Sequence, residues 1–146
     1  MDAHNFDLTR RDTFEDFAPV VIRFSDQDSM GHVNNVSIAA YIEAGRTMLL
    51  ESFLNQFDHP GLDYILARVA IDYRRELNYP GSVDVGARVI RLGSKSLTAG
   101  YGVFQGDICY ATAECVNVFY DMNTRRSVLP PKDVQQAIQQ KVMAGS

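Results

Sequence analysis

Polar side chains able to do chemistry are concentrated in one short stretch of the chain. Its candidate residues are Asp26, Asp28, Gly31, His32, Asn34 and Asn35. A carboxylate can attack a carbonyl carbon or deprotonate a water. An asparagine can cap a helix, and the first N–H groups of that helix then stay free, with the positive end of the helix dipole behind them. A carboxylate beside such donors pairs a base or nucleophile with an oxyanion site, which suits acyl transfer.

Two elements must position this stretch. Its N-terminal side follows a short strand predicted over Val20–Phe24, after Pro19. Its C-terminal side runs into a helix predicted to start at Asn34 or Asn35 and to end near Asn55 or Phe57. Apolar residues cover most of the circumference of this helix, which is typical of a buried helix. A glycine inside it, Gly45, indicates that another backbone comes close.

The rest of the chain has the pattern of an antiparallel sheet. From Ile65 to Arg74 apolar and polar residues alternate, which predicts a strand with one buried face. Further strands are predicted at 83–89, 97–104 and 108–120, and short turns between them predict antiparallel neighbours. The predicted fold class is α+β, with one antiparallel sheet wrapped around one helix. We expect a single domain over 1–146, with an irregular arm at 1–17 and a terminal helix within 132–146.

Composition narrows the possible partners. The net charge is −4, so there is no overall basic field for nucleic acid or an anionic membrane. No apolar run reaches the roughly 18 residues that span a bilayer, and the N-terminus does not have the pattern of a signal peptide, so we expect a cytoplasmic protein. Cys109 and Cys115, about 20 Å apart if they share one strand, are expected to be reduced, buried thiols. The scattered histidines predict no metal site.

Three stretches together resemble the hotdog fold, in particular the 4-hydroxybenzoyl-CoA thioesterase-like family of acyl-CoA thioesterases. The first stretch, Arg23 to Asn35, is similar to the family pattern D-x-D-x-x-G-H-V-N-N. The second, Tyr41-Ile42-Glu43-Ala44-Gly45-Arg46, is similar to Y-x-E-x-x-R on the family's central helix. The third is the strand series from Tyr73 to Pro130. Ile38 departs from the pattern, since the family usually has an aromatic residue there, and this bears on the shape of the acyl pocket.

The resemblance implies a role for each residue of the junction. Asp28 matches the acid nearest the thioester and is the predicted general base or nucleophile, whereas Asp26 is expected to be structural. His32 either moves protons or holds the loop. Asn34 and Asn35 either cap the helix, which is the default, or shape the loop or touch substrate. Gly31 lets the backbone either turn tightly or come close to the ligand. The backbone N–H groups from Val33 to Asn35 are the expected oxyanion donors, and Glu43 either lies near the active site or pairs with Arg46.

The same resemblance implies coenzyme A as part of the substrate, with no separate cofactor. Its phosphates require a local basic site, because the chain as a whole is acidic. The candidates for that site are Arg88, Arg91, Ser94, Lys95 and Ser96 around one turn, and Arg125-Arg126 in the last loop.

The predicted function is therefore hydrolysis of acyl-CoA or acyl carrier protein thioesters. One alternative is a hotdog hydratase or dehydratase that uses Asp28 with His32, although G-H-V-N-N is not the local motif of those enzymes. Another is a non-catalytic acyl-binding module. One helix cannot cover both faces of the sheet, and open edges need protection, so we expect a homodimer, with a tetramer of two dimers also open.

Overall fold

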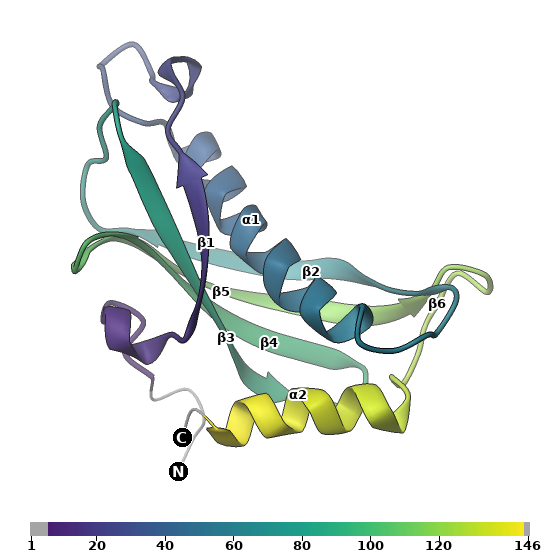
Figure 1. Cartoon of the computed structure of the whole chain (residues 1–146). Coiled ribbons are helices and arrows are strands. Elements are labelled where there is room, and N and C mark those ends of the chain that lie inside the picture. The colour runs from purple at the N-terminus through teal and green to yellow at the C-terminus, as the bar shows by residue number, and fades with distance from the viewer. Residues whose placement is uncertain (1–5, 145–146) are drawn as a thin grey trace.

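The computed structural model describes residues 6–144. In chain order the elements are a 3-10 turn η1 (Arg11–Thr13), β1 (Asp16–Val21), a second 3-10 turn η2 (Phe24–Asp26), α1 (Asn35–Leu54), β2 (Leu62–Tyr73), β3 (Ser82–Leu92), β4 (Ser96–Gln105), β5 (Ile108–Asp121), β6 (Arg126–Ser127) and α2 (Lys132–Ala144) (Figure 1). The predicted central and terminal helices are confirmed.

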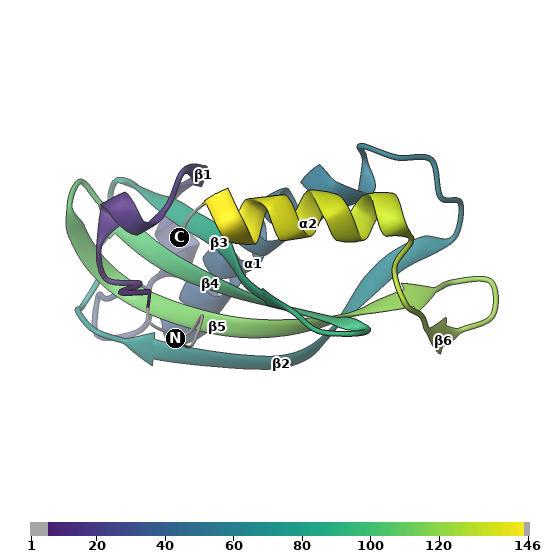
Figure 2. The same cartoon turned by 90° about the horizontal axis from the view of Figure 1, so that it is seen from below.

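The strands form one antiparallel sheet in the order β1-β3-β4-β5-β2, with β6 paired to the end of β5. The sheet curves around α1, and α2 lies against the end of β3 on the same side (Figures 1 and 2). The main hydrophobic core fills the layer between the sheet and the two helices. This is the arrangement that the sequence predicted, a sheet wrapped around one apolar helix.

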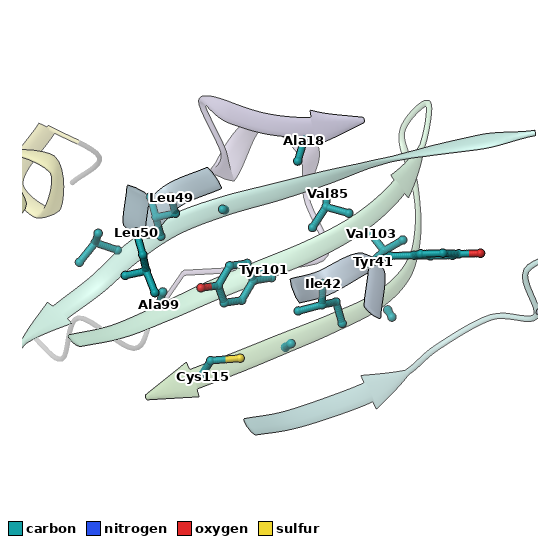
Figure 3. Packing of buried hydrophobic residues seen from close by; sticks show 14 of the residues in the cluster. Ala18, Tyr41, Ile42, Leu49, Leu50, Val85, Ala99, Tyr101, Val103 and Cys115 are labelled. Carbon is teal, nitrogen blue, oxygen red and sulfur yellow. The ribbon is translucent and has the colours of Figure 1, made fainter. Parts of the chain in front are cut away.

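The central helix α1 packs directly on β3 and β4. Ile42 and Leu50 are 0% and 2% exposed on its inner side (Figure 3). A Cβ atom at Gly45 would lie 2.6 Å from Val85 Cγ1, closer than real side chains approach. The absence of a side chain at Gly45 thus allows the close approach that the sequence indicated.

One part of the strand prediction is wrong. A bulge between Leu66 and Arg68 shifts the register of β2 against β5. Because a one-residue insertion moves later side chains to the other face, Ile65 and Val69 lie on opposite faces of the sheet. Both side chains are 46% exposed. The strand therefore lacks a single buried face, and its far side pairs with no other strand among the described residues.

The N-terminal region also differs from expectation. The first strand begins at Asp16 and ends at Val21. It therefore lies further toward the N-terminus than the strand predicted over 20–24 and overlaps it only at Val20 and Val21. Pro19 lies inside this strand, which is possible because β1 is at the sheet edge. The described part of the predicted arm is packed: Phe14 is 5% exposed and lies against Phe104 on the face away from α1.

The connection from β2 to β3 determines the shape of the site. The short turn at 78–81 predicted neighbouring strands, but β2 and β3 are separated by β4 and β5. The segment 74–81 passes beside the start of α1, and its buried Leu77 accepts a hydrogen bond of 2.8 Å from the Val33 N–H group. This crossing brings the end of β2 next to the polar junction.

Two further expectations concern thiols and membranes. Cys109 and Cys115 are both free and buried, as predicted. Within residues 6–144, no helix combines the length and the apolar character needed to cross a membrane.

Candidate active site

The polar junction folds into a tight loop that is closed by backbone hydrogen bonds. Gln27 and Val33 pair as an isolated antiparallel bridge. Inside it, the Asp28 N–H group donates to the His32 carbonyl at 2.7 Å, and the Gly31 N–H group donates to the Asp28 carbonyl at 3.1 Å. Gly31 has φ of 85°, in the left-handed region where glycine is favoured, so the tight turn, one of the two roles expected of it, is present.

The Asp28 carboxylate uses one oxygen for the loop and leaves the other available. Its Oδ1 atom accepts hydrogen bonds from the N–H groups of Met30 and His32, at 2.9 and 3.1 Å. Its Oδ2 atom accepts no hydrogen bond from any described residue, and the residue is exposed. Asp28 therefore shapes the turn and still presents a fixed, unshared oxygen, the form that a nucleophile or general base requires.

Asn34 caps α1, as expected by default. Its Oδ1 atom accepts a hydrogen bond of 2.7 Å from the Ser37 N–H group. The N–H groups of Val33 and Asn34 are used within the chain, donating to the carbonyls of Leu77 and Asp26. Only the last of the three expected oxyanion donors, the Asn35 N–H group, is free in the described structure, and the Val36 N–H group is free beside it. Two of the three predicted donors are therefore already used within the chain, and the free Val36 N–H group was not predicted.

A pocket joins these groups to the end of β2. Its lining residues come from the loop, the start of α1 and the crossing segment: Asp28, His32, Val33, Asn35, Ile38, Tyr73, Arg74, Arg75, Glu76 and Leu77. The structure thus brings together the predicted residues Asp28, His32, Val33 and Asn35. It also places Ile38, where the family pattern has an aromatic residue, in the pocket wall.

Five lining residues were not predicted as part of a site, namely Tyr73, Arg74, Arg75, Glu76 and Leu77. The Tyr73 hydroxyl donates to the Asn35 carbonyl at 3.2 Å, so it ties the end of β2 to the start of α1. The Arg74 guanidinium is bonded to Thr112 Oγ1 at 3.0 Å. The Arg75 guanidinium makes no hydrogen bond or ion pair with another described residue. The adjacent arginines at a strand end were the only signal in the sequence.

His32 is placed to serve both of the roles expected of it. Its Nε2 atom is 3.2 Å from Glu76 Oε2, and the two side chains are 33% and 71% exposed. An exposed pair of this kind contributes at most about 1 kcal/mol to stability. The ring lines the pocket. The contact holds the loop against the crossing segment and keeps the imidazole at the pocket wall.

Asp26 is buried and bonded, in line with its predicted structural role. Its side chain is 2% exposed and accepts from the Tyr41 hydroxyl at 2.6 Å and from the Arg23 backbone and guanidinium at 2.9 and 3.0 Å. Burial raises the pKa of this carboxyl, but the hydrogen bonds from Tyr41 and Arg23 outweigh burial and lower the pKa below 3.8. Burial and the neighbouring Asp26 carboxylate raise the pKa of Tyr41.

Other predicted site residues lie away from this pocket. Glu43 pairs with Arg46 at 3.3 Å, one of the two roles expected for it, and lies about 12 Å along the helix axis from Asn35. Arg91, Ser94, Lys95 and Ser96 lie at the end of β3 and in the turn into β4, whereas the Asp28 loop lies near the beginning of β3 (Figure 1). Since β3 has 11 residues, about 35 Å of strand separates them within one chain.

The described residues contain no group of three or more His, Cys, Asp or Glu side chains placed to hold a metal ion. Among the pocket residues, the predicted groups able to do chemistry are the Asp28 carboxylate, the His32 imidazole and the Asn35 N–H group. They lie on the loop and the first turn of α1, and Asp26 holds this region through hydrogen bonds with Arg23, Asn34 and Tyr41.

The sequence profile of the Thioesterase-like superfamily matches residues 22–138. This chain belongs to that superfamily. The match covers the junction, the central helix, strands β2 to β6 and part of α2, and it begins just after β1. The curved antiparallel sheet around α1 is the hotdog fold of these proteins.

Similar proteins agree with this assignment. The structure of a predicted thioesterase from Bacillus stearothermophilus superposes with a TM-score of 0.78 at 25% identity, covering 86% of this chain and 95% of that one. A Thermus thermophilus thioesterase, solved with coenzyme A and Zn, superposes with a TM-score of 0.76 at 26% identity, covering 90% and 97%. An uncharacterized Bacillus subtilis (strain 168) protein, YsmA, is 27% identical over 103 residues, 69% of this chain and 70% of its own length.

Proposed function

We propose that this protein hydrolyses acyl-CoA thioesters, with Asp28 as the reacting carboxylate. The observation that carries the proposal is the pairing of an unshared Asp28 oxygen with the free Asn35 N–H group at one pocket. A thioester carbonyl in this pocket would meet both the carboxylate and the N–H donor. A donor that stabilises the developing oxyanion is worth a few kcal/mol in known sites.

Two routes fit this arrangement. Asp28 Oδ2 can attack the carbonyl carbon and expel the thiolate, giving an acyl-aspartyl anhydride that water then hydrolyses. It can instead take a proton from a water that attacks the carbonyl. Both routes give the free acid and the thiol of coenzyme A. His32 stands at the pocket wall to carry a proton to the departing sulfur or to the water.

Coenzyme A as the carrier is supported by the similar Thermus thermophilus thioesterase solved with coenzyme A. In this chain, Arg75 at the pocket and Lys95 at the end of β3 offer cations for its phosphates. An acyl carrier protein is the other carrier that this chemistry admits.

The proposal includes a homodimer formed through β2. This 12-residue strand has an unpaired edge, and its Leu66 and Val69 side chains are 43% and 46% exposed. Exposed apolar edges of this length recruit another strand. A second copy paired there also brings another Lys95 turn to the assembly, which is required if phosphates bind at Lys95, because one chain keeps that turn far from Asp28.

Thiol release from a panel of acyl-CoA thioesters tests the function. A thioesterase releases free thiol from at least one of them in an Asp28-dependent manner. A hydratase changes enoyl absorbance without releasing thiol, and a binding module does neither. Either of these outcomes would overturn the proposal.

A further inference from the structure

The apolar layer between α1 and the sheet contains a polar cluster that the proposed chemistry does not use. Arg46 on α1 is only 8% exposed, although it carries a positive charge. Its guanidinium has five donors, and its partners are Glu43 Oε2 at 3.3 Å and the Cys115 thiol at 3.9 Å, both long contacts. Buried arginines normally have more and shorter hydrogen bonds.

Tyr101 on β4 lies in the same layer. Its side chain is 0% exposed, and its hydroxyl has no hydrogen-bond partner in the described structure. The ring lies below α1, with the hydroxyl on the side of Ala99 and Cys115 (Figure 3). Buried hydroxyls almost always have a partner, so one without a partner needs an explanation. A phenylalanine would fill this place equally well if packing alone mattered.

An apolar strip connects the Asp28 pocket with this cluster. Tyr73 lines the pocket, and Ile71 and Val69 continue along the same face of β2 over about 13 Å. Opposite them on β5 lie the small residues Ala111, Ala113 and Cys115. Tyr101 pairs with Ala113 from the other side, so its ring borders the same row. The floor of this strip beside α1 is thus built from small side chains.

We propose that the cluster of Arg46 and Tyr101 receives a neutral oxygen, a hydroxyl or oxo group, in the distal part of the acyl chain. This inference rests on the proposed function, in which the thioester lies at Asp28. The chain would run along Tyr73, Ile71 and Val69 and end where the two underbonded donors lie. A neutral oxygen fits better than a carboxylate, because Glu43 already balances the charge of Arg46.

Tyr101→Phe provides the test, with medium-chain acyl-CoA thioesters of matched length that end either in a plain alkyl segment or in one bearing a hydroxyl or oxo group. The wild type is expected to favour the oxygenated thioester in kcat/KM by about tenfold. Tyr101→Phe loses that preference while its kcat/KM for the plain thioester stays within about twofold. No preference in the wild type, or the same preference in both proteins, would overturn the assignment.

A binding measurement makes the test independent of turnover. The free oxygenated acid should raise the Tm of the wild type more than the plain acid does, and should lose this advantage with Tyr101→Phe. Without ligand, Tyr101→Phe should unfold at the same Tm or higher, because it removes an unbonded hydroxyl.

Tyr41→Phe is the matched control for stability, since it deletes a bonded hydroxyl from the same layer and should lower the Tm. If Tyr101→Phe also lowers the Tm and the two acids shift the Tm equally, the Tyr101 hydroxyl is structural and the inference fails. If no thioester is cleaved but the oxygenated acid still binds in a Tyr101-dependent way, the proposed function fails and the site stands.

Discussion

The Tyr41 hydroxyl donates a hydrogen bond of 2.6 Å to Asp26 Oδ2 and thereby joins α1 to the loop before it. The Asp26 carbonyl also accepts from the Asn34 N–H group, so this residue is bonded through both its side chain and its backbone. Asp28, two residues later, has an exposed carboxylate with one unshared oxygen. The two acids of the D-x-D pattern thus divide two tasks: the inner one fixes the loop, and the outer one faces the pocket.

The first prediction concerns Asp28. Asp28→Asn keeps an acceptor oxygen for the N–H groups of Met30 and His32, so the loop and the Tm should change little. The amide is neither a base nor a useful nucleophile, and kcat should fall about a hundredfold to ten-thousandfold. Thiol-release kinetics and thermal unfolding of the same preparations check both parts. A variant that retains near-normal kcat on every good substrate would remove Asp28 from the mechanism.

The second prediction concerns Asp26 and pH. Its carboxyl has a folded-state pKa below the ordinary 3.8, so its charged form stabilises the fold above that pH. The contribution is lost as pH falls through the folded-state pKa. Asp26→Asn should lower the free energy of unfolding by about 2 kcal/mol at pH 7, since it weakens bonds of a buried group. Urea unfolding at pH 7 and at about pH 3 should show a smaller difference from wild type at the acid pH. Equal differences at both values would contradict this explanation.

The sequence was sufficient for the helix cap and the tight turn of the junction, because both are local. A cap such as Asn34 bonds to a residue three positions away, and the turn at Gly31 needs only its own backbone. The burial of α1 could also be predicted, since its apolar residues cover most of its circumference. These features depend on residues that are close together in the chain, and a sequence pattern shows such residues directly.

The missed features depend on distant pairings. Nothing in the alternation around Leu66 signals the bulge that turns Ile65 and Val69 to opposite faces. The strand order places β2 beside β5, and only this order carries Arg75 and Glu76 below α1 to the Asp28 loop. The separation of Lys95 from Asp28 follows from the same topology. Short turns predict antiparallel neighbours in general, and the β2–β3 connection is an exception.

The third prediction concerns assembly. Leu66→Lys places a charge on the partly exposed edge strand, a device that natural proteins use to block strand pairing. The variant should shift the protein from dimer to monomer in light scattering at micromolar concentration. Ile108→Lys is the matched control, since Ile108 is similarly exposed, at 47%, but lies at the β4–β5 turn. A wild-type monomer, or a Leu66→Lys variant that stays dimeric, would exclude pairing through β2.

The fourth prediction concerns where the phosphates of coenzyme A bind. The chain has a net charge of −4, so it must hold this polyanion with a few local cations. Contacts with exposed phosphates are screened over about 8 Å at physiological salt. Raising the salt concentration should therefore raise KM for the CoA thioester more than it lowers kcat. Lys95→Ala should raise KM about two- to fivefold, whereas a truncated pantetheine thioester should respond neither to salt nor to the variant.

Arg75→Ala separates the two possible positions of the nucleotide. If the phosphates bind at the Lys95 turn, Arg75→Ala leaves KM for the CoA thioester unchanged, and the active site must combine residues from two chains, because β3 separates Lys95 from Asp28 within one. In that case Leu66→Lys should raise KM for the CoA thioester and leave KM for the pantetheine thioester the same. If Arg75→Ala raises KM and Lys95→Ala does not, the nucleotide lies beside the Asp28 pocket of the same chain. A KM that is flat with salt and unchanged in both variants would place the phosphates at neither position, and the Arg125-Arg126 pair would be the next to replace.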